Sequence, residues 1–128
     1  MRRFGAAVRH RRTGPGAAVL ALGRLKPGAM NKSEEAYAAH LEAQKAAGVI
    51  LWWKFEALKL RLADNTFYTP DFAVLLPDGT FIFKEVKGFM TDDANVKIKV
   101  AAETFPFQFF IVRKRAVKDG GGFSEDEV

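Results

Sequence analysis

Pro77-Asp78-Gly79 lies between two apolar segments and predicts a tight turn. The residues before it, 67–76, and those after it, 80–87, are rich in the aromatic and β-branched residues that favour strands. Two such segments joined by a short turn form a β-hairpin, in which the strands run antiparallel side by side. We therefore predict a hairpin in which the start of the first strand lies beside the end of the second.

This hairpin brings together three charged side chains. Asp71 lies early in the first strand, and Glu85 and Lys87 lie near the end of the second. Residues two apart share one face of a strand, so Glu85 and Lys87 project together. Phe81 and Phe83 precede them on that face and are expected to be core residues. Charged side chains that follow two expected core residues on one face favour a functional site over an ordinary solvated pair.

These side chains are the groups that metal-dependent phosphodiester hydrolysis requires. Asp71 and Glu85 can bind one or two divalent ions, which polarise a phosphate and lower the pKa of bound water. The Lys87 ammonium can orient that water or offset charge on the phosphate, and the Val86 carbonyl could be a further ligand. The chain has no Cys and only two His, so oxygen ligands, and hence Mg²⁺ or Mn²⁺, are expected.

The remaining patterns predict an α/β domain with a mixed sheet. In chain order we predict a helix over 31–48, strands over 49–55, 58–62, 67–76 and 80–87, a helix over 91–105 and a strand over 107–112. The last strand is apolar except for Gln108, which is typical of a strand buried on both faces. It follows a helix, which implies a crossover onto the sheet.

The two ends of the chain differ from its middle. Residues 1–30 hold seven basic residues and no acidic one, whereas residues 31–128 hold thirteen basic and fifteen acidic residues. We predict a flexible arm over 1–29, which either contacts phosphates through residues such as Arg11 and Arg12 or is a solvated leader. Residues 117–128, Gly-rich and then acidic, are predicted to be a disordered tail, which leaves 30–116 as the folded domain.

The first residues also bear on localisation. An Arg-rich start without acidic residues is similar to an organelle presequence, but the apolar run 17–22 is short for a secretory signal. No apolar stretch approaches the length of a membrane span, so no membrane partner is expected. We expect a cytoplasmic protein.

Pro70-Asp71 followed by Glu85-Val86-Lys87 resembles the signature of the PD-(D/E)XK nucleases, and the predicted order of elements resembles their αβββαβ core. Residues 24–114 are similar to phage and prophage endonuclease I-like proteins, which include Holliday junction resolvases. The segments that carry this likeness are Asn31-Lys32-Ser33-Glu34, Tyr68-Thr69-Pro70-Asp71-Phe72, Glu85-Val86-Lys87-Gly88 and Lys97-Ile98-Lys99. The resemblance implies a restriction-endonuclease-like fold and a divalent-metal endonuclease. It also implies branched DNA as substrate, a homodimer, and a role in phage DNA recombination inside a bacterial host.

The resemblance also assigns a third carboxylate to the metal site. In the family a Glu on the first helix completes the site, and Glu34 matches it. Glu34 shares a helix stripe with Ala38 and Leu41, the expected inward face. Asn31 with Glu34 also fits a capping box, which is the structural alternative.

Four further residues are implied as DNA contacts. Lys97 and Lys99 lie on the helix after the active strand and would contact phosphates, unless that helix face is simply solvated. Tyr68 and Thr69 would contact the DNA backbone beside the cut, or else pack within the strand.

Two other functions fit the same residues. One is a nuclease that prefers nicks or flaps, and the other is a non-catalytic DNA-binding module of nuclease fold in which the carboxylates serve only structure. The presence of Asp71, Glu85 and Lys87 together favours an enzyme.

Deletion of residues 1–29 tests the role of the arm. We expect weaker DNA binding and a flatter dependence on salt, because each lost phosphate contact lowers the slope of log K against log salt by about 0.9. Fluorescence anisotropy over a series of salt concentrations measures this slope. An unchanged slope would show that the arm is a solvated leader.

Overall fold

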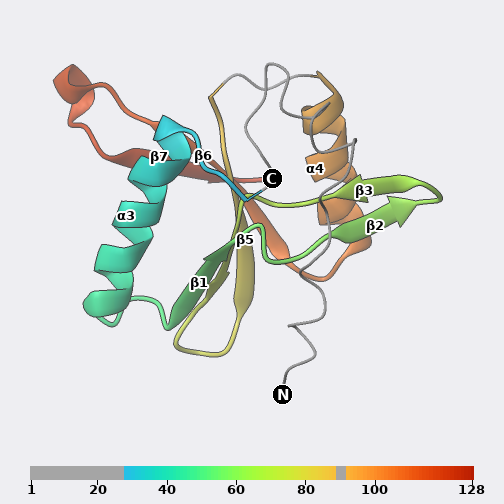
Figure 1. Cartoon of the computed structure of the whole chain (residues 1–128), viewed down its shortest axis with the longest axis horizontal. Coiled ribbons are helices and arrows are strands. Elements are labelled where there is room, and N and C mark those ends of the chain that lie inside the picture. Colours follow the sequence, from blue (N-terminus) through green and yellow to red (C-terminus); the bar gives the residue numbers. More distant parts are fainter. Residues whose placement is uncertain (1–27, 89–91) are drawn as a thin grey trace. The chain divides into compact units, whose positions relative to one another are not determined.

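Residues 28–88 and 92–128, which the computed structural model describes, form an α/β fold (Figure 1). Contacts divide the chain into two units, Met1–Asn31 and Lys32–Val128, and all helices and strands below belong to the second. Arg11 and Arg12 lie outside the described residues. Within the described part of the chain, no helix has the length and apolarity needed to cross a membrane.

The described elements are two α-helices, seven strands and one short 3-10 helix. The helices are α3 (Lys32–Ala46), α4 (Asp92–Thr104) and the 3-10 helix η1 (Val117–Asp119). The strands are β1 (Trp52–Phe55), β2 (Leu60–Ala63), β3 (Thr66–Tyr68), β4 (Phe72–Leu75), β5 (Phe81–Val86), β6 (Gln108–Lys114) and β7 (Phe123–Glu127).

Five strands form one mixed sheet in the order β1-β4-β5-β6-β7, and β2 and β3 form a separate two-stranded sheet. β4 and β5 are antiparallel and are joined by the predicted turn, in which Gly79 has a φ of 90° and its N–H donates to the Leu76 carbonyl at 2.9 Å. β6 lies between β5 and β7 and is parallel to β5. The mixed sheet, the hairpin and the crossover strand are thus confirmed.

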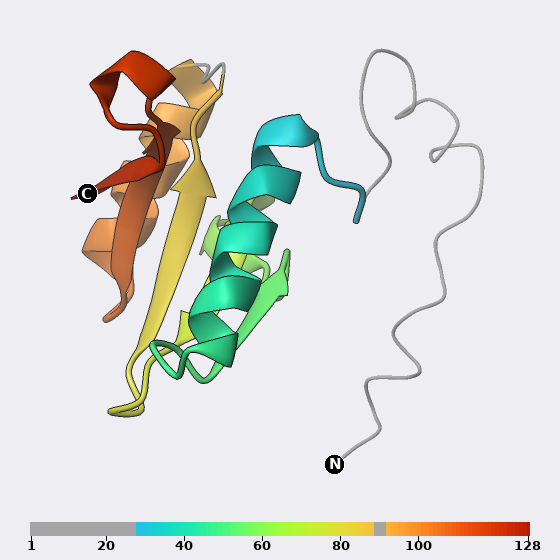
Figure 2. The same ribbon diagram turned by 90° about the vertical axis from the view of Figure 1, so that its left-hand side faces the viewer.

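The two helices cover opposite faces of the large sheet (Figure 2). Phe72 and Ala73 are neighbours in β4 and therefore point to opposite faces. The Phe72 ring contacts Tyr37 of α3, whereas Ala73 belongs to the buried cluster that contains Ile98 and Ala101 of α4. Leu41 is also fully buried, so the predicted inward stripes of both helices are confirmed.

The prediction of one strand over 67–76 is wrong, because these residues contribute to two strands in different sheets. β3 pairs with β2, and β4 pairs with β1 and β5. Between them lies Pro70, which is fully buried and has no N–H to donate to a strand partner. The β2–β3 hairpin is therefore an insertion between β1 and β4, and without it the elements through β6 follow the predicted order αβββαβ.

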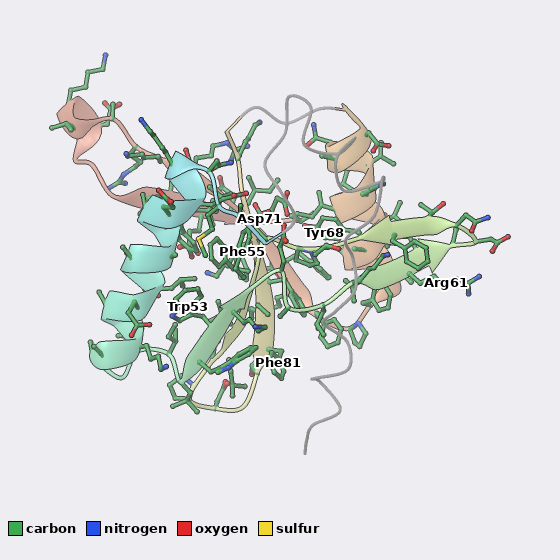
Figure 3. The ribbon with its side chains drawn as sticks, in the orientation of Figure 1. Trp53, Phe55, Arg61, Tyr68, Asp71 and Phe81 are labelled. Atoms are coloured by element: carbon green, nitrogen blue, oxygen red, sulfur yellow. The ribbon has the colours of Figure 1, made fainter. Side chains whose placement is uncertain are left out.

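The prediction that Phe81 is a core residue is also wrong. Its side chain is 41% exposed, whereas Phe83 on the same face is buried. Phe81 is the first residue of β5 and pairs with Leu75, the last residue of β4, so it lies at the end of the sheet (Figure 3). Its ring packs edge-on against Trp52 and not into the core.

The prediction of a disordered tail over 117–128 is wrong as well. Residues 123–127 form β7, which pairs antiparallel with β6. The acidic residues of β7 have basic or polar partners on the sheet. Arg113 binds Asp126 at 3.0 Å, the Gln108 amide donates to Glu127 at 3.3 Å, and Lys84 forms an ion pair with Glu125. An acidic sequence is ordered here because it supplies the counter-charges of the sheet edge.

The Lys84–Glu125 pair is the buried polar contact that holds β7 from the α3 side. Lys84 is 9% exposed and its ammonium lies 4.8 Å from the centroid of the Phe110 ring. Tyr37 of α3 donates its hydroxyl to the other Glu125 oxygen at 2.8 Å. Removal of Glu125 would leave a buried ammonium and a buried hydroxyl without their acceptor.

We therefore expect Glu125→Ala to lower the free energy of unfolding by about 3 kcal/mol, since a charge left unpaired inside a protein is costly. Urea denaturation measures this loss. Glu127→Ala is the matched control on the exposed part of β7 and should change stability by less than about 0.5 kcal/mol. Equal stability of Glu125→Ala and wild type would show that the ion pair does not hold β7.

Candidate functional site

Asp71 and Glu85 lie opposite each other where β4 begins and β5 ends. The register pairs Phe72 with Lys84, so the residue before Phe72 faces the residue after Lys84. Two hydrogen bonds join them across the strands. The Asp71 N–H donates to Glu85 Oε1 at 3.3 Å, and the Val86 N–H donates to Asp71 Oδ2 at 2.9 Å. The predicted juxtaposition of the two carboxylates is therefore confirmed.

Tyr68 is the third member of this group. Its hydroxyl donates to Glu85 Oε1 at 2.7 Å, and its side chain is only 6% exposed. Figure 3 shows Tyr68 and Asp71 close together in the middle of the fold. The sequence predicted Tyr68 as a DNA contact, but its hydroxyl is turned towards Glu85 and away from solvent. Thr69, the next residue, is exposed.

The surroundings raise the pKa values of both carboxyl groups. For Asp71 the main cause is burial, followed by the charge of Glu85, and the hydrogen bond from Val86 opposes the rise. For Glu85 burial again dominates, while hydrogen bonds from Tyr68 and Asp71 favour the charged form. Burial also raises the pKa of Tyr68 far above its usual range, so its hydroxyl remains a donor. The surroundings of the site thus disfavour the charged form of both carboxyl groups.

Two acidic residues from other elements add negative charge near this pair. The charges of Glu34 in α3 and of Glu56 after β1 raise the pKa values of both Asp71 and Glu85. Glu56 was not predicted. Its backbone is left-handed, with a φ of 49°, and its N–H donates to the Asp71 carbonyl at 2.8 Å. No local sequence signal marks it, because its position depends on the β2–β3 insertion that starts there.

A divalent cation would suit Asp71 and Glu85. Both are carboxylates, the ligands that Mg²⁺ prefers, and a positive ion would offset the charge that burial penalises. Asp71 Oδ1 and Glu85 Oε2 accept no hydrogen bond from the described residues. These two oxygens could therefore serve as ligands without loss of the hydrogen bonds that hold the pair.

Glu34 does not complete a compact set of ligands in this arrangement. Within residues 28–88 and 92–128, no three side chains of His, Cys, Asp or Glu form a group that could hold a metal ion. Glu34 is close enough to act on both carboxyl groups through its charge. Its role as a third ligand, and that of the Val86 carbonyl, stay predictions.

The predicted cations lie around the site in different settings. Lys87 is half-buried directly after β5, where its N–H donates to the Val112 carbonyl at 2.7 Å. Among the described residues its ammonium has no ion-pair partner. Lys97 lies 3.6 Å from Asp93, one turn earlier in α4, and Lys99 is exposed.

Comparison of the chain with protein-family models, with curated proteins and with solved structures finds no match. The geometry and the chemistry of the described residues therefore carry the functional argument.

The pKa shifts predict how stability depends on pH. The folded protein keeps protons on Asp71 and Glu85 that the unfolded chain loses in the ordinary carboxyl range. This contribution to stability is complete at low pH and is lost as the pH rises through the raised pKa values, by up to about 1.4 kcal/mol per pH unit for each proton. In EDTA we expect the free energy of unfolding to fall from about pH 5 to about pH 9, and to fall less in Asp71→Asn.

Urea denaturation at each pH measures this effect. Asp78→Asn is the control, since Asp78 lies exposed in the hairpin turn and the hydrogen bond from Thr80 lowers its pKa. A ligand of the folded state adds stability by mass action. Mg²⁺ should therefore stabilise wild type at high pH and have little effect on Asp71→Asn. The same fall with pH in both proteins would contradict the assignment of these pKa shifts.

Proposed function

We propose that the protein is a divalent-metal-dependent endonuclease that hydrolyses phosphodiester bonds in branched DNA. The observation that carries this proposal is the Asp71–Glu85 pair, two half-buried carboxylates joined across β4 and β5 with raised pKa values. Pairs of strongly shifted carboxyl groups are more common at functional sites than elsewhere. Lys87 follows directly after β5 and completes the set of side chains that such hydrolysis requires.

In the proposed mechanism Asp71 and Glu85 would hold Mg²⁺ or Mn²⁺, and such an ion would supply polarisation of the scissile phosphate and a bound water of lowered pKa. The hydrogen bond from Val86 fixes Asp71, and the bonds from Asp71 and Tyr68 fix Glu85. Lys87 offsets the charge that builds on the phosphate or orients the attacking water. The charges of Glu34 and Glu56 strengthen the attraction for a cation.

The choice of branched DNA rests on the resemblance to endonuclease I-like proteins, together with the order αβββαβ and its restriction-endonuclease-like implication. A four-way junction presents two symmetry-related strands, which suits two active sites on a two-fold homodimer. We further propose that such a dimer acts in phage or prophage recombination, in the cytoplasm of a bacterial host.

We expect the purified protein to cut a synthetic four-way junction in Mg²⁺ or Mn²⁺ and to leave a linear duplex of the same sequence intact. Asp71→Asn, Glu85→Gln and Lys87→Ala should each abolish cutting while binding persists, because they remove metal ligands or the cation at the phosphate. Gel analysis of end-labelled strands measures cutting, and mobility shift measures binding. Asp78→Asn is the control for the change from carboxylate to amide.

Other results would identify a different function. Junction binding without cutting in either metal would indicate a non-catalytic DNA-binding module, in which the carboxylates serve structure. Cutting of nicked or flap substrates in preference to the junction would keep the nuclease and refute the resolvase. Equal cutting of linear duplex and junction would refute the preference for branched DNA.

A further inference from the structure

We propose that Tyr68 is a positioning residue for the metal site, which holds the Glu85 carboxylate in the orientation that binds the cation. This inference rests on the proposed function and names a residue that acts through Glu85, not on the DNA. It gives the β2–β3 insertion a role at the site, because Tyr68 is the last residue of β3.

The two carboxylate oxygens of Glu85 differ in their hydrogen bonds. Tyr68 and the Asp71 N–H both donate to Oε1, at 2.7 Å and 3.3 Å. Two donors on one oxygen fix the rotation of a carboxylate about its last torsion, which is otherwise broad. Oε2 accepts no hydrogen bond from the described residues and is the oxygen left for a cation. Ligating carboxylates are commonly held in this way by outer hydrogen bonds.

The Tyr68 hydroxyl is itself fixed by packing. Its ring is buried in a cluster with Leu60 of β2, Ile98 of α4 and Phe109 of β6, whose ring centroid lies 6.4 Å away at a tilted angle. β3 belongs to the small sheet, so Tyr68 ties that sheet and α4 to the end of β5. Because residues of three elements pack against the ring, the Tyr68 hydroxyl has little freedom to move. The hydrogen bond from this hydroxyl therefore restrains the Glu85 carboxylate.

A purely structural role is the competing explanation, and the chain offers a matched control for it. Tyr37 is also fully buried, and it also donates its hydroxyl to a glutamate, Glu125, at 2.8 Å. Glu125 lies with Lys84 on the α3 side of the sheet, away from Asp71 and Glu85. Tyr68→Phe and Tyr37→Phe thus each remove one buried hydroxyl, but only Tyr68→Phe removes it from the proposed metal site.

The test is the binding of Mn²⁺ to the DNA-free protein, measured by isothermal titration calorimetry on wild type and both variants. We expect Tyr68→Phe to weaken Mn²⁺ binding by about 10- to 100-fold, the usual effect of a lost outer hydrogen bond. Tyr37→Phe should bind Mn²⁺ as wild type does, although both variants lose stability. A stabilising osmolyte in all samples keeps the variants folded.

Cleavage as a function of Mn²⁺ concentration gives a second measurement. Tyr68→Phe should need more Mn²⁺ for half-maximal cutting and recover most of its rate at saturation. If wild type binds and cuts but Tyr68→Phe has the same Mn²⁺ affinity, this inference is overturned and the proposed function stands. Equal weakening in both variants also overturns it, in favour of a loss of stability. If wild type binds no Mn²⁺ and cuts nothing, both proposals fail.

Discussion

The register of β4 against β5 determines on which face of the sheet each buried charge lies. Phe72 pairs with Lys84, which sets Asp71 opposite Glu85 and turns Lys84 towards α3 and β7. A shift of one residue would exchange the two faces, since neighbouring side chains point in opposite directions. Turn chemistry and the burial of apolar residues on both faces hold this register, and the charges follow from it.

The charged side chains on the two faces of the sheet differ in their partners. On the α3 side, Lys84 is neutralised by Glu125, and Tyr37 satisfies the remaining carboxylate oxygen. On the other side, Asp71 and Glu85 repel each other, and Glu34 and Glu56 add to the repulsion. Among the described residues, their hydrogen bonds come from neutral donors, namely two backbone N–H groups and the Tyr68 hydroxyl. The first arrangement stabilises the fold, whereas the second brings like charges together, and strongly shifted carboxyl groups of this kind are more common at functional sites than elsewhere.

Features that depend on neighbouring residues were predictable from sequence. The turn at Pro77-Asp78-Gly79 has its own chemistry, and the inward stripes of the helices follow from spacing. The meeting of Asp71 and Glu85 required only that turn and the alternation of strands. From these local signals the mixed sheet, the crossover to the parallel strand β6 and the pair of carboxylates could be predicted.

Features that depend on distant partners were not predictable. The strand over 67–76 is broken because Pro70 is buried where the chain passes from the small sheet to the large one. Residues 117–128 were predicted to be a disordered tail because the partners of their acidic residues, Lys84 and Arg113 among them, are not close in sequence. For Tyr68 the sequence left packing and DNA contact as alternatives, because no local signal shows its contacts with α4 and Glu85. Each error concerns a residue whose contact lies far along the chain.

The β2–β3 insertion connects these points, because both of its ends lie at the site. It begins after Glu56, whose left-handed backbone donates to the Asp71 carbonyl, and it ends at Tyr68, which donates to Glu85. A non-glycine residue in that conformation costs on the order of 1 kcal/mol and persists only where its surroundings require it. The residues at its two ends therefore bring a strained backbone, a charge and a hydrogen-bond donor to one pair of carboxylates. The two ends of the hairpin thus hold both members of the pair, Asp71 through its backbone carbonyl and Glu85 through its side chain.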